Sequence, residues 1–362
     1  MFVSHLSLKD FRSYENLELS LKTGQNIFIG ENGEGKTNII EALMYLALLS
    51  SHRISSDQPL IKLGSERAYL RAKIESEERT TLVELEINNG KANRAKVNQN
   101  PVRSQKELLG LVKSVCFSPE DLDLVRGDPS ERRSFLDQLL IQKSPRIAGV
   151  ISDYERALKQ RNSLLKSRAP ESSLRSWSEH LATFGGELIA GRIKLINEIE
   201  PLFQLAYKNL SSKKLAQLGY KSSIPNPTTD KEVNRDSILK VVDEVRTQEL
   251  ERGISLVGPH RDDLLLNLGE HPVKGYASHG ESWSIALALR LASYQLFINE
   301  GAKPILILDD VFSELDEGRR EKLLEIADSA EQTFITVAVE NDLPKAIKGA
   351  RFKVELGKVV AL

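Results

Sequence analysis

Hydrophobic and polar residues alternate with a period of two in several stretches of the first hundred positions. Residues 3–8, 14–21 and 80–87 follow this pattern, which is typical of strands that are buried on one face. A short apolar run at 27–29 leads into a glycine-rich turn. Residues 38–49 place their apolar side chains on one face of a helix. The first part of the chain therefore predicts strands arranged around one helix.

The hydrophobic period changes to that of helices between about residue 119 and residue 215, where Leu, Arg, Lys, Glu and Gln dominate. Residues 225–230 predict an exposed loop. Strand character returns near Ser255, and the apolar runs at 305–308 and 333–339 predict buried parallel strands. We therefore predict an α/β fold. Its core is formed by residues 1–118 and 255–362, and residues 119–254 form a mainly helical inserted lobe.

Composition narrows the class of protein. The chain has 362 residues, a formal net charge of −1 and one cysteine, so no disulfide can form within it. No apolar run is long enough to span a membrane, and no leader pattern precedes residue 5, so we expect a cytoplasmic protein. The near-zero charge argues against a globally basic nucleic-acid binder but leaves room for a local basic face, for example at 156–175.

A glycine-rich turn between the predicted strand at 27–29 and the predicted helix at 38–49 fits the phosphate-loop pattern G-x-x-x-x-G-K-[ST]. Its glycines let consecutive backbone N–H groups face one anion, and the helix adds its positive N-terminal end. We expect Lys36 to reach the β- and γ-phosphates of ATP and Thr37 to bind Mg²⁺. The alternative is a chance glycine-rich turn. The candidate ATP-binding residues are Gly30, Glu31, Asn32, Gly33, Glu34, Gly35, Lys36 and Thr37.

Two carboxylates follow the predicted strand at 305–308. A buried strand that ends in acids at the carboxyl edge of a parallel sheet faces the nucleotide crevice. We therefore expect Asp309 to hold Mg²⁺, directly or through water. We expect Asp310 to orient or deprotonate the attacking water, which makes Asp310 and Lys36 the candidate catalytic residues. The alternative is a pair of solvated acids at the end of a core strand.

A third motif resembles one found in ABC-type ATPases. Thr37 and Asp309 lie 272 positions apart, and a large insertion between these two elements is typical of that class. Residues 278–281 (Ser-His-Gly-Glu) precede a predicted helix in the order and spacing of the ABC signature. There, a serine hydroxyl, glycine amides and a helix N-terminus contact the γ-phosphate bound by the opposite subunit. Ser278 and Gly280 are therefore candidates to contact ATP across a dimer; an ordinary serine N-cap is the alternative.

The chain departs from the ABC pattern at several positions. His279 replaces a glycine of the signature and Glu281 replaces its glutamine. Since a carboxylate is repelled by a γ-phosphate, we expect Glu281 to point away from it. No switch histidine follows the strand at 333–339, and residues 118–121 offer acids where a Q-loop glutamine is expected. The missing switch histidine and the altered Q-loop predict slow hydrolysis.

Three further segments resemble the RecF family of bacterial DNA-repair proteins. They are the runs Pro-Glu-Asp, Val-Arg-Gly-Asp-Pro and Arg-Arg-Ser-Phe-Leu-Asp within 119–137, Gly-Pro-His-Arg-Asp-Asp-Leu at 258–264, and Leu-Lys-Asp-Phe-Arg-Ser-Tyr at 8–14. With the motifs above, the resemblance spans residues 3–320 in the family's order. It implies an ABC-type P-loop ATPase head, a mixed sheet with helices, in which the helical insertion forms a second lobe. Such a fold is similar to the head of SMC-type chromosome proteins.

The resemblance also implies a function. RecF proteins dimerise with ATP and bind DNA, notably at the edges of single-stranded gaps, and they act with RecR and RecO to help RecA load. We therefore expect a slow, DNA-stimulated ATPase of recombinational repair that uses ATP and Mg²⁺. We also expect an ATP-dependent homodimer that binds single- and double-stranded DNA, and a partner of RecR and, indirectly, of RecO and RecA. The alternatives are a nucleotide-binding subunit of an ABC transporter and a non-catalytic scaffold that ATP stabilises.

Some charged residues allow both a structural and a functional interpretation. Arg12, at the end of a predicted strand, contacts the nucleotide phosphates or pairs with a nearby acid. Arg132 and Arg133 form a solvated helix face or contact phosphate or DNA. Residues 260–262 are candidates for a structural knot of ion pairs. The lysines of 208–221 contact DNA or keep a helix soluble.

Overall fold

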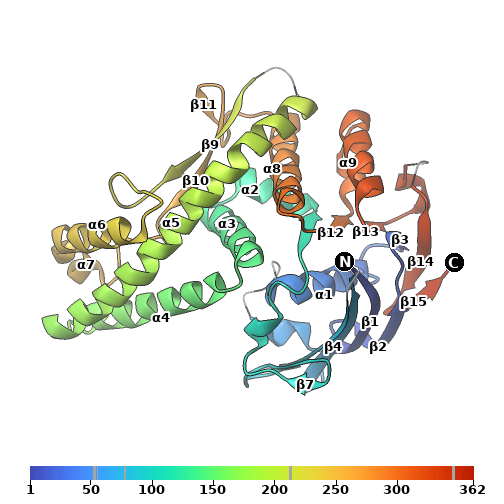
Figure 1. Ribbon diagram of the computed structural model, residues 1–362, viewed down its shortest axis with the longest axis horizontal. Helices are drawn as coiled ribbons and strands as arrows, with labels where there is room; N and C mark the ends of the chain where they lie inside the picture. Colours follow the sequence, from blue (N-terminus) through green and yellow to red (C-terminus); the bar gives the residue numbers. More distant parts are fainter. Residues whose placement is uncertain (52–53, 55, 77–78, 212–213, 345–346) are drawn as a thin grey trace. The chain divides into compact units, whose positions relative to one another are not determined.

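The computed structural model of the protein describes residues 1–51, 54, 56–76, 79–211, 214–344 and 347–362 (Figure 1). By their contacts, the residues group into two compact units. The first consists of Met1–Asp121 and Leu289–Leu362, and the second of Leu122–Ala288. Residues 255–288, which we assigned to the ATPase core, group with the inserted residues here. The reason is a sheet within the second unit, described below.

The first unit is built on two sheets. One has the strand order β2-β1-β4-β5-β6-β7, with antiparallel neighbours throughout. The other has the order β15-β14-β3-β13-β12-β8, in which only β15 runs antiparallel to its neighbour. The strands are β1 (Phe2–Phe11), β2 (Tyr14–Ser20), β3 (Gly24–Ile29), β4 (Arg67–Glu75), β5 (Thr80–Asn88), β6 (Arg94–Val97), β7 (Asn100–Pro101), β8 (Ser114–Phe117), β12 (Ile305–Asp309), β13 (Gln332–Val337), β14 (Gly349–Glu355) and β15 (Lys358–Ala361).

The helices of the first unit connect and cover these sheets. They are α1 (Lys36–Leu48), α9 (Glu317–Ser329), and the short 3-10 helices η1 (Gln58–Leu60), η2 (Gln105–Leu108), η3 (Pro119–Asp121), η4 (Val311–Glu314) and η5 (Glu340–Asp342). One buried hydrophobic cluster combines side chains of α1 with residues of both sheets. This packing explains the two sequence patterns. Alternation suits the antiparallel strands, which expose one face to solvent. β12 and β13 are buried on both faces, and β12 is accordingly apolar up to its final aspartate.

The second unit is mainly helical. Its helices are α2 (Leu122–Arg126), α3 (Pro129–Lys143), α4 (Ile147–Lys166), α5 (Glu171–Leu210), α6 (Lys231–Glu244), α7 (Arg246–Arg252) and the first part of α8 (His279–Asn299). A small antiparallel sheet has the order β11-β10-β9, from β9 (Ala216–Lys221), β10 (Asp263–Leu268) and β11 (His271–Pro272). β9 pairs with β10 along its whole length, which joins residues 263–268 to the insertion. The strand expected near Ser255 begins instead at Asp263, so that expectation was wrong by eight positions.

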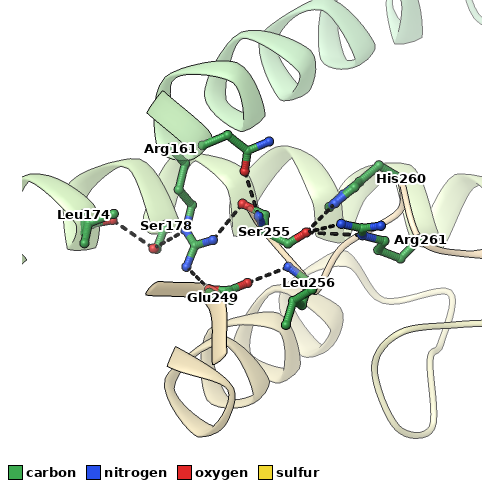
Figure 2. Close-up of polar contacts among 9 residues, drawn as sticks. Arg161, Leu174, Ser178, Glu249, Ser255, Leu256, His260 and Arg261 are labelled. Atoms are coloured by element: carbon green, nitrogen blue, oxygen red, sulfur yellow. Dashed lines mark hydrogen bonds and ion pairs between the residues drawn. The ribbon is translucent and has the colours of Figure 1, made fainter. Parts of the chain in front are cut away.

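A buried ion pair connects separate helices of the second unit (Figure 2). The guanidinium of Arg161, on α4, donates to Glu249 Oε2 of α7 at 2.5 Å, to Ser178 Oγ of α5 at 2.9 Å and to Ser255 Oγ at 2.7 Å. Glu249 also accepts from the backbone N–H of Leu256 at 2.7 Å. Because all the charged groups are buried and mutually bonded, this cluster orders the segment that leads to β10.

The substitution Glu249→Ala is expected to destabilise the second unit by about 3–5 kcal/mol, because Arg161 is left buried without a counter-charge. Trp177 and Trp283 both lie in this unit, so tryptophan fluorescence during urea unfolding reports on it. The control is Glu171→Ala, which removes the exposed partner of Arg246 and is expected to change stability by at most about 1 kcal/mol. Equal unfolding midpoints for the two variants would contradict the prediction.

No helix in the described part of the chain is both long enough and apolar enough to cross a membrane.

Candidate nucleotide-binding site

The predicted phosphate loop, Gly30–Thr37, connects β3 to α1. Gly33 and Gly35 have φ angles of +90° and +112°, in the left-handed region that favours glycine. A Cβ on Gly35 would lie 2.9 Å from both Ser13 Oγ and Tyr14 Oη. Gly35 is therefore required both by its backbone conformation and by the close approach of the β1–β2 turn.

Lys36 is the first residue of α1 and is only 3 % exposed. Its ammonium donates to the carbonyl oxygens of Gly30 and Glu31 at 2.6 and 3.2 Å. The same Nζ lies 3.9 Å from Asp310 Oδ2. The structure thus brings together Lys36 and Asp310, which lie 274 positions apart in the sequence.

The acidic pair lies at the carboxyl end of β12, between β13 and β8 in the parallel sheet. Asp309 is buried, and its Oδ1 accepts from Thr336 Oγ1 at 2.5 Å. The backbone N–H of Asp310 donates to the same Thr336 hydroxyl at 2.9 Å. Asp310 has a left-handed φ of +48°, so the chain turns sharply directly after the buried acid. One threonine on the neighbouring strand thereby orients both acidic residues.

Burial raises the pKa of both carboxyl groups at this strand end. Burial raises the pKa of Asp309 to about 6, and the nearby charges of Asp310 and Glu120 act in the same direction, against the hydrogen bond from Thr336. Burial also raises the pKa of Asp310, which the charge of Lys36 opposes. The ionised form of this acidic group would therefore be stabilised by a bound cation.

The available donor atoms fit Mg²⁺. Thr37 offers a hydroxyl and Asp309 a carboxylate, and Mg²⁺ prefers such oxygen ligands. Among the described residues, no group of three or more His, Cys, Asp or Glu side chains is arranged to hold a metal. Mg²⁺ beside a nucleotide usually takes one or two protein ligands together with phosphate and water, which is the number that Thr37 and Asp309 provide.

Arg12 pairs with an acidic residue, which was one of the two alternatives predicted for it. Its guanidinium binds the fully buried carboxylate of Glu41, on α1, through two hydrogen bonds of 2.6 and 2.7 Å. Arg12, Ser13 and Asn38 also line a pocket of about 620 Å³ together with residues between 58 and 65. A contact of Arg12 with nucleotide phosphates remains a prediction. Its pairing with Glu41 fixes it beside the start of α1.

Two acidic residues, Glu120 and Asp121, stand where the Q-loop glutamine was expected, and we did not predict their contacts. Asp121 is buried and accepts two hydrogen bonds from Arg290 of α8, at 3.0 and 2.7 Å. Its neighbour Glu120 is exposed and acts electrostatically on Asp309 and Asp310. The only signal in the sequence was the presence of acids at 118–121. Their partners come from segments far away along the chain.

The signature-like segment forms a capping box at the start of α8. The backbone N–H of Ser278 donates to Glu281 Oε2 at 2.9 Å, and the N–H of Glu281 donates to Ser278 Oγ at 3.2 Å. Lys214 Nζ donates to the other carboxylate oxygen of Glu281 at 2.8 Å. This Lys214 bond and the Ser278 N–H lower the pKa of Glu281 to about 2. The carboxylate thus folds back onto the helix N-terminus. The N-cap interpretation of Ser278 is confirmed, and its contact with a phosphate stays a prediction.

The candidate residues are divided between the two units. Gly30–Thr37, Arg12, Asp309 and Asp310 lie in the first unit, whereas Ser278 and Gly280 lie in the second. Among them, the described contacts join the phosphate loop to the acidic strand end.

Several charged or titratable residues of the RecF-like segments at 119–137 and 258–264 have structural partners within the second unit. Arg132 binds both carboxylate oxygens of Asp263, at 2.7 and 3.0 Å. Arg133 donates to the carbonyl of Asp262 at 2.9 Å. His260 shares a hydrogen bond of 2.6 Å with Tyr154, and its burial lowers its pKa to about 4. Arg261 donates to the carbonyl of Ser255, and Asp262 accepts from Tyr220, Ser222 and the N–H of Ser223. The described contacts of 260–262 are thus structural, but they are hydrogen bonds to neutral groups and not the expected knot of ion pairs.

A phosphate loop followed by a helix, an acidic strand end beside its lysine, and a large helical insertion before a capped signature helix define an ABC-type ATPase head. The family model described as "RecF/RecN/SMC N terminal domain" matches residues 2–355. The protein of Streptomyces avermitilis named "DNA replication and repair protein RecF" is 51% identical over 370 residues, which covers 99% of each chain. A protein of the same name from Kineococcus radiotolerans is 50% identical over 376 residues and 96% of each chain. The chain belongs to the RecF family.

Solved structures agree with this assignment. The structure titled "recombination mediator protein RecF-ATP in RecFOR pathway" matches with a TM-score of 0.91 and 28% identity, over 100% of this chain and 97% of that chain. The Smc head domain from Pyrococcus furiosus matches with a TM-score of 0.57 and 16% identity, over 100% of this chain and 96% of that chain, which is a likeness of fold alone. The predicted ABC-type head fold is confirmed, and the matches do not favour a transporter subunit.

Proposed function

We propose that this protein is an ATP-dependent DNA-binding protein of recombinational repair, and that two copies enclose ATP and Mg²⁺ between them. The observation that carries the proposal is the distance of 3.9 Å between Lys36 Nζ of the phosphate loop and Asp310 Oδ2 of the acidic strand. Lys36 and Asp310 come from the two halves of the proposed ATPase site, which the second unit separates along the sequence. The relatives named as DNA replication and repair proteins, and the solved structure of RecF with ATP, support the same function.

Each residue of the site has a role that follows from its chemistry. The N–H groups of Gly33–Lys36 and the Lys36 ammonium bind the β- and γ-phosphates, which releases Lys36 from the loop carbonyls. Thr37 and Asp309 hold Mg²⁺, which supplies positive charge beside the phosphates. Asp310 orients the attacking water and accepts its proton. Hydrolysis is slow, because the position of the ABC switch histidine is occupied by residues 339–341 without one.

The second copy completes the site in this proposal. Ser278 Oγ, the Gly280 N–H and the N-terminus of α8 meet the γ-phosphate held by the partner, because an anion is stabilised at the start of a helix. ATP thus links nucleotide state to dimerisation. Hydrolysis removes the shared charge and lets the dimer separate. The reaction therefore sets how long the protein stays on DNA.

A basic pocket in the first unit supports a contact with DNA. It has a volume of about 590 Å³ and lies on the exposed face of β4, β5 and β6. Cross-strand pairing aligns its charged side chains in rows, since Glu84 lies between Arg71 and Lys96. The lining cations Arg71, Arg94, Lys96 and Arg103 outnumber the lining acids Glu84 and Glu86. Such a surface favours the phosphate backbone over any particular base sequence.

The finer parts of the proposal concern partners and place of action. Single- and double-stranded DNA that meet at a gap junction are the proposed ligand. RecR is the proposed direct partner, with RecO and RecA acting through it, and the cytoplasm is the proposed compartment. Their support is membership of the RecF family and the likeness to solved recombination mediator proteins of the RecFOR pathway.

Light scattering of the purified protein with magnesium and ATP, ADP or no nucleotide, each with and without a gapped duplex, tests the function. We expect the mass to double with ATP and not with ADP, and the gapped duplex to strengthen the ATP-dependent dimer. A protein that stays monomeric at saturating ATP, with and without DNA, would overturn the proposal.

The variant Asp310→Asn is expected to bind ATP and to hydrolyse it at least about 100-fold more slowly, because a positioned base contributes that much or more. The ATP-bound dimer should then leave DNA more slowly than the wild type. Phosphate release and dissociation from a labelled gapped duplex measure the two effects. Wild-type dissociation rates in the variant would count against the assigned role of Asp310.

A further inference from the structure

Glu281 presents an electrostatic problem at the proposed dimer site. It occupies the position of a neutral glutamine in the ABC signature, three residues after Ser278, which is proposed to meet the γ-phosphate of the partner's ATP. Its pKa of about 2 keeps the side chain ionised at neutral pH. An ionised carboxylate beside a triphosphate opposes binding, so the chain needs a compensating group.

Lys214 is in position to be that group. Lys214 lies just before β9, which pairs with β10. These strands and the start of α8 belong to the same unit. Its Nζ donates to Glu281 Oε1 at 2.8 Å, while Oε2 is engaged by the Ser278 N–H at 2.9 Å. Each carboxylate oxygen therefore has its own donor, and the carboxylate is held against the backbone of Ser278.

The Lys214–Glu281 ion pair is exposed to solvent, unlike the buried ion pairs that stabilise the fold. The side chain of Lys214 is 52 % exposed and that of Glu281 is 26 % exposed. At the surface such an ion pair contributes at most about 1 kcal/mol to folding. Glu281 nevertheless contacts the N–H of Ser278 directly, and Lys214 contacts Glu281. Their charges therefore act on an approaching anion more than on the stability of the unit.

We propose that Lys214 is a positioning residue of the signature segment, and that it neutralises Glu281 so that Ser278 and the start of α8 can approach the terminal phosphate of a nucleoside triphosphate on a second copy of the chain. In this arrangement the Lys214–Glu281 pair replaces the neutral side-chain amide of a glutamine signature. The proposal rests on the ATP-dependent dimer described above.

A charge-rescue experiment tests this role. Lys214→Met leaves Glu281 uncompensated, and we expect it to raise the ATP concentration needed for half-maximal dimerisation by about tenfold or more. Glu281→Gln in the Lys214→Met background removes the repulsion and is expected to restore dimerisation to within about threefold of the wild type. Lys214→Arg, which keeps the charge, is expected to behave as the wild type.

The controls separate electrostatics from folding. Lys208, exposed in the last turn of α5, loses the same charge in Lys208→Met, and that variant is expected to dimerise normally. Thermal unfolding and ATP binding at protein concentrations below dimerisation should be unchanged in every variant.

Three outcomes would overturn the role of Lys214 while leaving the proposed function intact. They are normal dimerisation of Lys214→Met, failure of Glu281→Gln to rescue it, and an equal defect in Lys208→Met. A wild-type protein that fails to dimerise with ATP would instead refute the proposed function, and this role with it.

Discussion

The substitution Lys36→Met is expected to weaken ATP binding by about 100-fold or more and to abolish ATP-induced dimers at the same time. Lys36 lies at the start of α1, and its ammonium contacts the carbonyl of Gly30 and faces Asp310. It thereby supplies the positive charge of the loop. Charge-assisted hydrogen bonds to phosphate are each worth about 1.5–3 kcal/mol, so the loss of two accounts for the size of the effect. Calorimetric titration with magnesium–ATP and light scattering measure the two consequences.

A matched variant checks that the effect belongs to the loop. Lys91 is exposed in the turn between β5 and β6, and Lys91→Met removes the same charge away from the site. It should bind ATP and dimerise as the wild type does. Wild-type affinity for ATP in Lys36→Met would disprove the assignment of Gly30–Thr37 as the nucleotide site.

The second large effect is expected from Ser278→Arg. The variant should bind ATP with unchanged affinity, because the phosphate loop lies in the other unit, yet form no dimer at saturating ATP. Arginine removes the hydroxyl that accepts the Glu281 N–H and puts a long side chain where the partner's γ-phosphate is proposed to enter. The lost N-cap destabilises α8 by about 1 kcal/mol, which is too little to unfold the unit.

The two variants together separate binding from assembly. Lys36→Met should lose both properties, and Ser278→Arg only the second, as measured by titration and scattering on the same samples. Thermal unfolding serves as the folding control for both. A Ser278→Arg protein that dimerises normally with ATP would remove the signature segment from the site and leave ATP binding untouched.

Local motifs accounted for much of the fold and of the nucleotide site. The phosphate loop is readable because its glycines, lysine and threonine are contiguous, and because the strand and helix beside it follow simple hydrophobic periods. The acidic end of β12 was found for the same reason. Both predictions depend on chemistry within about ten residues. The structure places Lys36 Nζ 3.9 Å from Asp310 Oδ2, which brings the two elements together, and their roles toward a nucleotide stay predictions.

The boundary of the inserted lobe shows where sequence periodicity stops being informative. Residues 255–288 contain strand character, which led us to assign them to the ATPase core. Their strand β10 instead pairs with β9 of the insertion. Periodicity identifies a strand by its buried face, but the pairing partner depends on which chain segments are folded beside it.

The sequence by itself determined the class of this protein: a phosphate loop, an acidic strand end and a signature-like helix start, in the order of an ABC-type ATPase, within a chain of the RecF family. Only the tertiary structure decided which charges are paired. Arg12 with Glu41, Asp121 with Arg290 and Lys214 with Glu281 each join distant positions. The physical reason is that a charged side chain is stabilised by whatever counter-charge the fold brings within a few ångströms, and spacing along the chain does not encode that distance.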